Sequence, residues 1–180
     1  MKNIALFGGS FDPPHIGHIQ IAEALKNLDF IEKVVVMPTY LNPLKSSFFA
    51  DANLRLQWLK EIFEDDKSVE VSSFEVEQKR KVPSIETVKH LKKFHDNIHL
   101  VIGADNLASL SHWYKYEELK SLVKFIIISR NEIDIPESFI KLELDIPISS
   151  TELRGEIDTR YLPQKVAKKI ENYYKENNAN

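Results

Sequence analysis

Short apolar segments rich in Val, Ile and Phe alternate along this chain with amphipathic segments of helical periodicity. The apolar segments, which predict strands, are residues 3–7, 33–37, 69–73, 98–102 and 123–128. The predicted helices between them are residues 16–28, 51–64, 85–95 and 116–122. Strands that alternate with helices form parallel β-α-β units with right-handed crossovers. The pattern therefore predicts an α/β fold with a Rossmann-like doubly wound parallel sheet.

The length and the C-terminal pattern indicate a single domain over residues 1–180. A chain of 180 residues is long enough to bury roughly 70% of its unfolded surface in one unit. We expect a core over about residues 1–130 and C-terminal helices over about residues 145–177. Ser150, Thr151 and Glu152 are typical of a helix N-terminus, and Pro163 is expected to start the last helix.

A glycine-rich turn, GGSFDPPHIGH over residues 8–18, follows the first predicted strand and leads into the first predicted helix. From Ile16 onward the apolar residues recur at helical spacing, so the turn ends where the helix begins. Backbone N–H groups and the helix dipole bind anions at such a point, and Gly8 and Gly9 let an anion approach the main chain. The turn therefore predicts a phosphate site.

Two further segments are expected at the same edge of the sheet. Residues 38–45 and 103–105 each follow a predicted strand. Doubly wound sheets bind ligands outside the carboxyl ends of their strands, at the switch point in strand order. We therefore expect three loops to meet at one site.

His15 and His18 are three residues apart, so they share a helix face, and Gly17 leaves space beside it. Two imidazoles there can donate hydrogen bonds to phosphate oxygens and stabilise the charge that develops in phosphoryl or nucleotidyl transfer. The pair is equally compatible with a helix cap and a packing residue, which are commoner roles for histidine. Zinc needs a third and fourth ligand, and the chain has no cysteine or nearby carboxylate–histidine cluster to supply them.

Three segments carry a resemblance to a known family. The turn is similar to the GGxFDPxHxGH form of bacterial nicotinate-nucleotide adenylyltransferases, which belong to the H-x-G-H nucleotidyltransferase superfamily. Residues 148–154, ISSTELR, resemble the family's ISSTxIR motif. Residues 102–119 resemble its G-x-D…W-x-x-x-x-x-L element. The resemblance runs from Met1 to the final helix. It implies adenylyl transfer from ATP to nicotinate mononucleotide, which gives deamido-NAD and pyrophosphate.

The resemblance also implies roles for individual residues. The catalytic residues would be His15, His18 and Arg154. Those implied in ATP binding are Gly8, Gly9, Ser10, Phe11, His15, Gly17, His18, Ser149, Ser150, Thr151 and Arg154. Those expected in substrate binding are Lys45 as a phosphate contact, Ser84, Thr87, Gly103, Asp105, Trp113 and Tyr114, and Arg130 on the adenosine side. Mg²⁺ would enter through the ATP phosphates, with no metal ligand from the protein.

Simpler roles stay open for several of these residues when they are taken alone. Residues 149–152 are also an ordinary helix cap, and Asp105 fits a cap as well as a ribose contact. Trp113 is either a packing aromatic or, as the resemblance implies, a platform for the pyridine ring. Lys45 and Arg55 are either phosphate contacts or solvated surface charges.

One segment departs from the family. Where a Pro-Ser-Tyr-Thr pattern is usual before the third helix, this chain has KVPSIET over residues 81–87. That neighbourhood is implied in binding the nicotinate carboxylate, so the choice of acceptor is open. The alternatives are nicotinamide mononucleotide, pantetheine phosphate, or a nucleotide-binding regulatory module without catalysis. A dehydrogenase is disfavoured because residues 8–13 do not fit G-x-G-x-x-G.

Charge and composition exclude other classes of protein. A net charge of −3 gives no reason to expect a nucleic-acid partner. No apolar run approaches a membrane span, and the segment before Gly8 is too short for a signal peptide. The chain has no cysteine, which fits a reducing compartment. We therefore expect a cytoplasmic protein, and the sequence predicts no particular oligomeric state.

Overall fold

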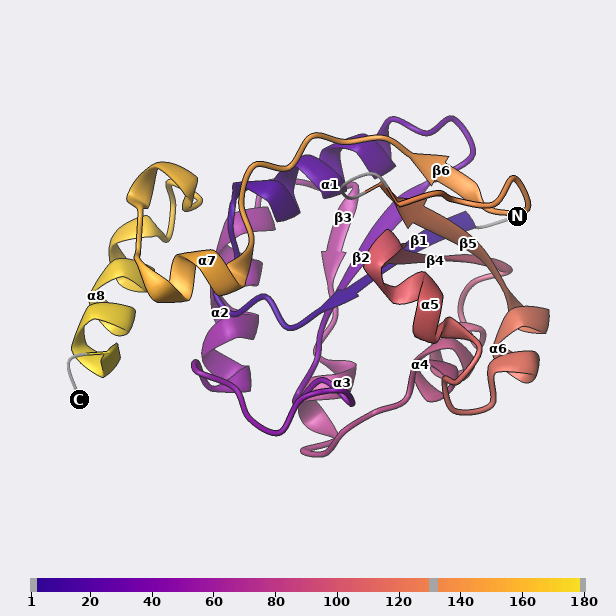
Figure 1. The fold of residues 1–180 in the computed structure, drawn as a ribbon, viewed down its shortest axis with the longest axis horizontal. Coiled ribbons are helices and arrows are strands. Elements are labelled where there is room, and N and C mark those ends of the chain that lie inside the picture. The colour runs from indigo at the N-terminus through magenta and orange to yellow at the C-terminus, as the bar shows by residue number, and fades with distance from the viewer. Residues whose placement is uncertain (1–2, 130–132, 179–180) are drawn as a thin grey trace.

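The computed structural model describes residues 3–129 and 133–178, and its centre is a six-stranded parallel sheet (Figure 1). The strand order is β3-β2-β1-β4-β5-β6. The strands are β1 (Asn3–Gly9), β2 (Lys33–Pro38), β3 (Val69–Val71), β4 (Asn97–Gly103), β5 (Val123–Ile128) and β6 (Ile140–Leu142). Each strand pairs in parallel with its neighbours. This arrangement confirms the predicted Rossmann-like doubly wound sheet.

The sheet extends in two directions from β1. The chain adds β2 and β3 on one side of β1, and then β4, β5 and β6 on the other. The strand order therefore reverses between β1 and β4, which pair directly through Phe7 and Val101. Gly9 and Gly103 end these two strands. A doubly wound sheet binds its ligands at this point.

Helices cover both faces of the sheet because successive strand side chains point to opposite faces. The helices are α1 (Ile16–Lys26), α2 (Ala52–Phe63), α3 (Phe74–Glu77), α4 (Ser84–Leu91), α5 (Leu107–Leu110), α6 (Tyr116–Leu122), α7 (Ser150–Gly155) and α8 (Ala167–Asn178), with 3₁₀ turns η1 (Ala104–Asn106) and η2 (Thr159–Tyr161). Ile4 and Leu6 of β1 pack with α4 and α6 in one core, whereas Ala5 and Phe7 pack with α1 and α2 in the other. In the described part of the chain, none of these helices could cross a membrane.

The C-terminal helices form a third core beside α2, at one end of the molecule (Figure 1). Trp58 of α2 is 2% exposed and packs in this core with Leu153 of α7 and with Val166, Ile170 and Tyr174. This packing holds α7 and α8 against the sheet-bearing part of the chain. The predicted C-terminal helices are therefore confirmed.

Several predicted bounds are wrong although the element types are confirmed. β3 ends at Val71 and α4 at Leu91, short of the predicted residues 73 and 95. The last helix begins at Ala167 rather than at Pro163, because the Val166 N–H donates to the Pro163 carbonyl at 3.0 Å and closes a turn. The sequence did not predict β6, α3 or α5. Each has only three or four residues, which is too short for a periodic signal.

Candidate active site

The turn after β1 is packed closely enough to require glycine at two positions. Phe11 is 2% exposed and has a φ of 49°, in the left-handed region. A Cβ on Gly9 would lie 3.2 Å from the Phe11 ring. A Cβ on Gly17 would lie 2.5 Å from Ile146 Cγ2 and 2.9 Å from His15 Nδ1. Gly17 therefore leaves room beside the two histidines because it has no Cβ, and the Ile146 side chain packs into part of that room.

The two histidines stack against each other at the start of α1. His15 is the N-cap residue, and the ring centroids of His15 and His18 are 3.7 Å apart with an interplanar angle of 27°. The His15 N–H donates to His18 Nδ1 at 3.0 Å, so a neutral His18 ring carries its hydrogen on Nε2. This tautomer has the donor that a phosphate oxygen requires. The predicted shared helix face is confirmed.

Asp12 connects the turn to two distant segments. Its carboxylate is 3% exposed and accepts hydrogen bonds from the N–H groups of Phe49, at 2.8 Å, and Ala50, at 2.9 Å. The Tyr174 hydroxyl of α8 donates to the same carboxylate. Burial, and next the charge of Asp12, raise the pKa of Tyr174, so the hydroxyl stays protonated. Sequence reasoning assigned no role to Asp12 or Tyr174.

Arg55 is buried beneath the turn after β1, so it is not the solvated surface charge of the simpler interpretation. Its side chain is 1% exposed, although it lies on α2. Its Nε donates to the Ala50 carbonyl at 2.9 Å, and Nη1 donates to the Ser10 carbonyl at 2.5 Å and the Thr39 carbonyl at 3.0 Å. Nη2 donates to the Tyr40 carbonyl at 3.0 Å. The guanidinium therefore fastens the turn after β1 to the loop after β2.

Residues 149–152 form the cap that the simpler interpretation of this segment predicts. Ser149 Oγ accepts a hydrogen bond from the Glu152 N–H at 3.2 Å, and the Ser149 N–H donates to Glu152 Oε2 at 2.8 Å. This reciprocal pair is a capping box at the start of α7. The cap fixes where α7 begins, and so the direction in which the side chains of residues 150–154 project from the helix.

The same segment also docks on the histidine turn. Ser150 Oγ donates to the Pro13 carbonyl at 2.9 Å, and Arg154 Nη1 donates to the Asp12 carbonyl at 2.6 Å. Arg154 Nη2 donates to Thr151 Oγ1 at 3.1 Å. Two motifs about 140 residues apart in sequence are therefore joined by direct hydrogen bonds. The cap and the site are compatible, because different side chains serve each.

Lys45 adds a cation on the same side. Desolvation lowers the pKa of Lys45, and the neighbouring positive charge of Arg154 lowers it further. Lys45 does not line the adjoining cavity. The guanidinium of Arg154 and the ammonium of Lys45 give the side of the site next to the histidine turn a positive charge, which suits a polyphosphate.

A cavity of about 330 Å³ adjoins the turn at the carboxyl ends of β1, β2 and β4. The predicted site residues that line it are Gly8, Gly9, Ser84, Thr87, Gly103, Trp113 and Tyr114. Trp113 is half-buried against the core, and its Nε1 has no hydrogen-bond partner within the described residues. The loops after β1, β2 and β4 do meet at one place, as expected.

The cavity also contains residues that sequence reasoning missed. Glu75, Thr39, Asn106 and His112 line it, whereas Asp105 does not. The Glu75 carboxyl is 6% exposed, and burial raises its pKa to about 7. Arg130 lies outside the described residues. No local pattern distinguishes Glu75 from Glu77, the other acid of the four-residue helix α3.

The structure offers no side-chain site for a resident metal. Within residues 3–129 and 133–178, no group of three or more His, Asp or Glu side chains could hold a metal ion. Asp12, the carboxylate of the histidine turn, is already bonded to two N–H groups and the Tyr174 hydroxyl. The donors present fit a metal that arrives on a ligand's phosphates better than one that the chain holds.

Comparison with known proteins identifies the family. The cytidylyltransferase-like family model matches residues 6–156. A protein of Sulfurimonas denitrificans, named "Probable nicotinate-nucleotide adenylyltransferase", is 57% identical over 98% of this chain and 97% of its own length. A Campylobacter fetus protein of the same name is 48% identical over 98% and 99%. The chain belongs to the nicotinate-nucleotide adenylyltransferase family.

Solved structures with this family name share the fold. A nicotinic acid mononucleotide adenylyltransferase from Plasmodium falciparum, complexed with NaAD, covers 97% of the chain with a TM-score of 0.78 and 24% identity. A Vibrio parahaemolyticus structure bearing the nicotinate-nucleotide adenylyltransferase name covers 94% with a TM-score of 0.70 and 22% identity. At these identities the likeness concerns the fold, which agrees with the six-stranded parallel sheet found here.

Proposed function

We propose that this chain transfers the adenylyl group of ATP to nicotinate mononucleotide, which forms deamido-NAD and releases pyrophosphate. One observation carries the proposal: a cationic surface made by two docked motifs adjoins an aromatic-lined cavity at the switch point of the sheet. The surface suits a triphosphate, and the cavity suits a flat ring. The names of the relatives agree with this reaction.

The reaction requires alignment and charge neutralisation more than covalent chemistry. A phosphate oxygen of the acceptor bonds to the α-phosphorus of ATP as the bond to the bridging oxygen breaks, and that electron pair leaves with pyrophosphate. In-line geometry and preorganised donors supply most of the acceleration for such transfers. The imidazoles of His15 and His18, which stack on each other, are proposed to donate to the α- and β-phosphate oxygens.

The remaining residues bind the two substrates. Arg154, Ser150 and Thr151 contact the β- and γ-phosphates, with Lys45 beside them. The main chain at residues 8–11 approaches the ATP phosphates. Trp113 stacks on the pyridine ring, and Ser84 and Thr87 lie at the ring substituent. Asp105 is proposed as a ribose contact and Arg130 as a contact on the adenosine side, both from the sequence alone.

Mg²⁺ belongs to this proposal as a companion of ATP. It is held through the phosphate oxygens and supplies further neutralisation of their charge. The chain's own cations and imidazoles hold the phosphates in place. We also propose the cytoplasm as the compartment in which the chain acts, since ATP and mononucleotides are available there.

A pyrophosphate-release assay with ATP and a set of acceptors tests the function. At pH 6 we expect nicotinate mononucleotide to exceed nicotinamide mononucleotide by at least ~10²-fold in kcat/KM, because an amide NH₂ would face the N–H donors at the start of α4. Pantetheine phosphate should give no turnover. Trp113→Ala should weaken both pyridine acceptors equally, since they share the ring face. Absence of turnover with every acceptor would overturn the proposal and favour a binding module.

A further inference from the structure

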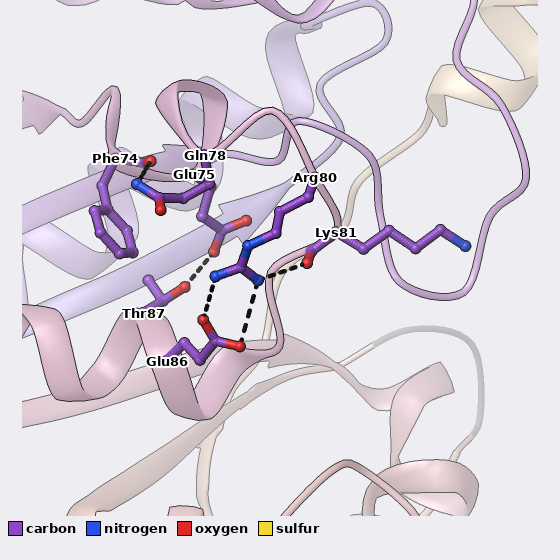
Figure 2. Close-up of polar contacts among 7 residues, drawn as sticks. All are labelled: Phe74, Glu75, Gln78, Arg80, Lys81, Glu86 and Thr87. Atoms are coloured by element: carbon purple, nitrogen blue, oxygen red, sulfur yellow. Dashed lines mark hydrogen bonds and ion pairs between the residues drawn. The ribbon is translucent and has the colours of Figure 1, made fainter.

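Glu75 is a buried acid in the wall of the proposed acceptor cavity. It lies on the short helix α3, is 6% exposed and lines the cavity together with Thr87 and Trp113. Figure 2 shows the Thr87 side chain of α4 directed at the Glu75 carboxyl group, and Thr87 Oγ1 donates to Glu75 Oε1 at 2.5 Å. In the described part of the chain this is the one hydrogen bond that the carboxyl group makes. The reaction as derived above gives Glu75 no role.

No cation among the described residues pairs with this carboxyl group. The guanidinium of Arg80 is engaged elsewhere, because Nη2 pairs with Glu86 at 2.6 Å and Nη1 donates to the Lys81 carbonyl at 3.1 Å (Figure 2). Lys81 extends the other way, and its Nζ donates to the Pro43 carbonyl at 3.3 Å. Burial raises the pKa of Glu75 to about 7, against the opposing hydrogen bond from Thr87.

The other ionisable groups lie on the elements packed around α3. They are Glu77 on α3, Lys79 after it, Glu86, Lys89 and His90 on α4, Arg55, Lys60 and Glu61 on α2, Lys33 on β2, and His112 across the cavity. None of them is a source of the shift in the Glu75 pKa, which comes from desolvation and Thr87. Desolvation and the Thr87 hydrogen bond are therefore sufficient to account for the shifted pKa of Glu75.

The hydrogen bond from Thr87 also decides where the acid's proton lies. A hydroxyl that donates to Oε1 leaves the proton of the neutral acid on Oε2. A neutral carboxylic acid is then a donor toward a ligand, whereas an ionised one is an acceptor only. The two acceptors considered above differ in this respect: nicotinate presents a carboxylate that only accepts, and nicotinamide presents an amide that also donates.

We propose that Glu75 is a specificity-determining residue of the acceptor site, which in its neutral form donates a hydrogen bond to the ring carboxylate of nicotinate mononucleotide. The inference rests on the proposed function. A donor paired with a carboxylate makes one of the stronger hydrogen bonds in proteins. Once ionised, Glu75 repels that carboxylate and instead accepts from the amide of the competing nucleotide. Acceptor preference is therefore coupled to the ionisation of one side chain.

The sign of the pH effect follows from this coupling. Below pH 7 Glu75 is neutral and favours the carboxylate acceptor, and above pH 7 it is ionised and disfavours it. The pH profile of kcat/KM reports the free enzyme, so its midpoint should be that of the unliganded Glu75. Taking the ratio of kcat/KM for the two acceptors cancels effects that both reactions share, such as the ionisation of the phosphates, and Glu75→Gln separates Glu75 from His112 in the same cavity wall.

The test measures that ratio between pH 5.5 and pH 8.5 in the intact chain and in two variants. We expect the ratio to fall by at least about tenfold from pH 6 to pH 8, because the neutral fraction of a group with a pKa near 7 falls tenfold over that range. Glu75→Gln, which keeps a donor and cannot ionise, should make the ratio independent of pH. Glu77→Gln is the matched control, because Glu77 lies on the same helix and is exposed. It should keep the slope of the unaltered chain.

A third variant, Thr87→Val, leaves Glu75 itself unchanged and removes its hydrogen-bond partner. The Thr87 hydrogen bond lowers the pKa of Glu75, so Thr87→Val should move the midpoint of the ratio to higher pH. The affinity of each acceptor can also be compared directly, without ATP, by the quenching of Trp113 fluorescence at pH 6 and pH 8. A residue that served only structure would alter stability without moving the midpoint.

The outcomes separate the two proposals. A ratio that stays flat in the unaltered chain, or keeps its slope in Glu75→Gln, overturns the role of Glu75 while adenylyl transfer stands. Turnover with neither acceptor at any pH overturns the proposed function, and the role of Glu75 falls with it. A slope in the unaltered chain that Glu75→Gln abolishes and Thr87→Val shifts supports both.

Discussion

The two halves of the site are stabilised in different ways. On the phosphate side, Asp12, Arg55 and Arg154 hold main-chain groups of segments far apart in sequence. On the acceptor side, Trp113 Nε1 and Thr39 Oγ1 are buried without a hydrogen-bond partner in the described residues, and both line the cavity. The first half is complete without ligand, whereas the second presents polar atoms that a ligand can satisfy.

This difference predicts which kinetic property each half of the site controls. A preorganised surface stabilises charge in the transition state because no reorganisation is needed during the reaction. A cavity with unsatisfied polar groups discriminates between ligands, because the wrong ligand leaves those groups unpaired. Variants on the phosphate side should therefore lower kcat, and variants on the acceptor side should change selectivity.

His18→Ala should have the largest effect and tests the phosphate half. We expect kcat to fall by a factor of about 10²–10⁴, since removal of one preorganised donor costs about 3–5 kcal/mol of barrier. Steady-state kinetics with ATP and nicotinate mononucleotide measures the change. Gln20→Ala, on the exposed face of the same helix, is the control and should be near normal. Normal turnover of the His18 variant would remove the distinction between the two halves.

The ionisation of Glu75 should appear in the stability of the unliganded chain. Its folded pKa of about 7 is above the ordinary value of 4.5, so its contribution is complete below pH 4.5 and is lost as pH rises through 7. A shift of this size corresponds to about 3 kcal/mol. Denaturant unfolding at pH 5 and pH 8 should show this loss relative to Glu75→Gln. Equal pH dependence in both chains would mean that the acceptor wall carries no buried charge.

The fold and the phosphate side could be predicted because their signals are local. The spacing of apolar residues predicted five of the six strands in the described residues. The GGSFDPPHIGH and ISSTELR segments each contain their proposed functional side chains within a short stretch of sequence. The helix cap at Ser149 is a short-range pattern as well. Local patterns of this kind need no knowledge of tertiary contacts.

The site residues that the sequence did not predict depend on tertiary contacts that no local pattern encodes. Tyr174 reaches Asp12 across 162 positions, and the role of Arg55 depends on carbonyls from two loops. In the sequence Arg55 resembles any exposed helix cation, and only burial by the neighbouring loops reveals its function. Glu75 was missed for the same reason, because its partner Thr87 lies on another helix.

Arg154→Lys should have an intermediate effect and sharpens the account of how the two motifs are joined. The guanidinium contacts the Asp12 carbonyl and Thr151 Oγ1 with separate nitrogens, and an ammonium cannot reproduce both contacts. We expect the KM for ATP to rise or kcat to fall by about 10-fold, near 1.4 kcal/mol. Arg160→Lys is the matched control, since Arg160 is exposed and pairs with Asp158. An unchanged ATP dependence would reduce residues 149–154 to a helix cap.

Tyr174→Phe should have the smallest effect on turnover, because it acts on stability, and it asks whether α8 belongs to the phosphate half at all. The variant removes the hydroxyl that donates to Asp12 and leaves the buried carboxylate with the two N–H groups of Phe49 and Ala50. Loss of a buried hydrogen bond to a charged group should lower the free energy of unfolding by about 1.5–3 kcal/mol, less whatever the remaining donors recover. Tyr173→Phe is the control on the adjacent residue, because its hydroxyl donates to the Phe49 carbonyl at an exposed position, at 3.1 Å. Its effect should stay within about 0.5 kcal/mol. Denaturant unfolding of the two variants at one pH measures the difference. Equal stabilities would mean that α8 only covers Trp58, and that the histidine turn is held by Arg55, Arg154 and the N–H groups of residues 49–50 without it.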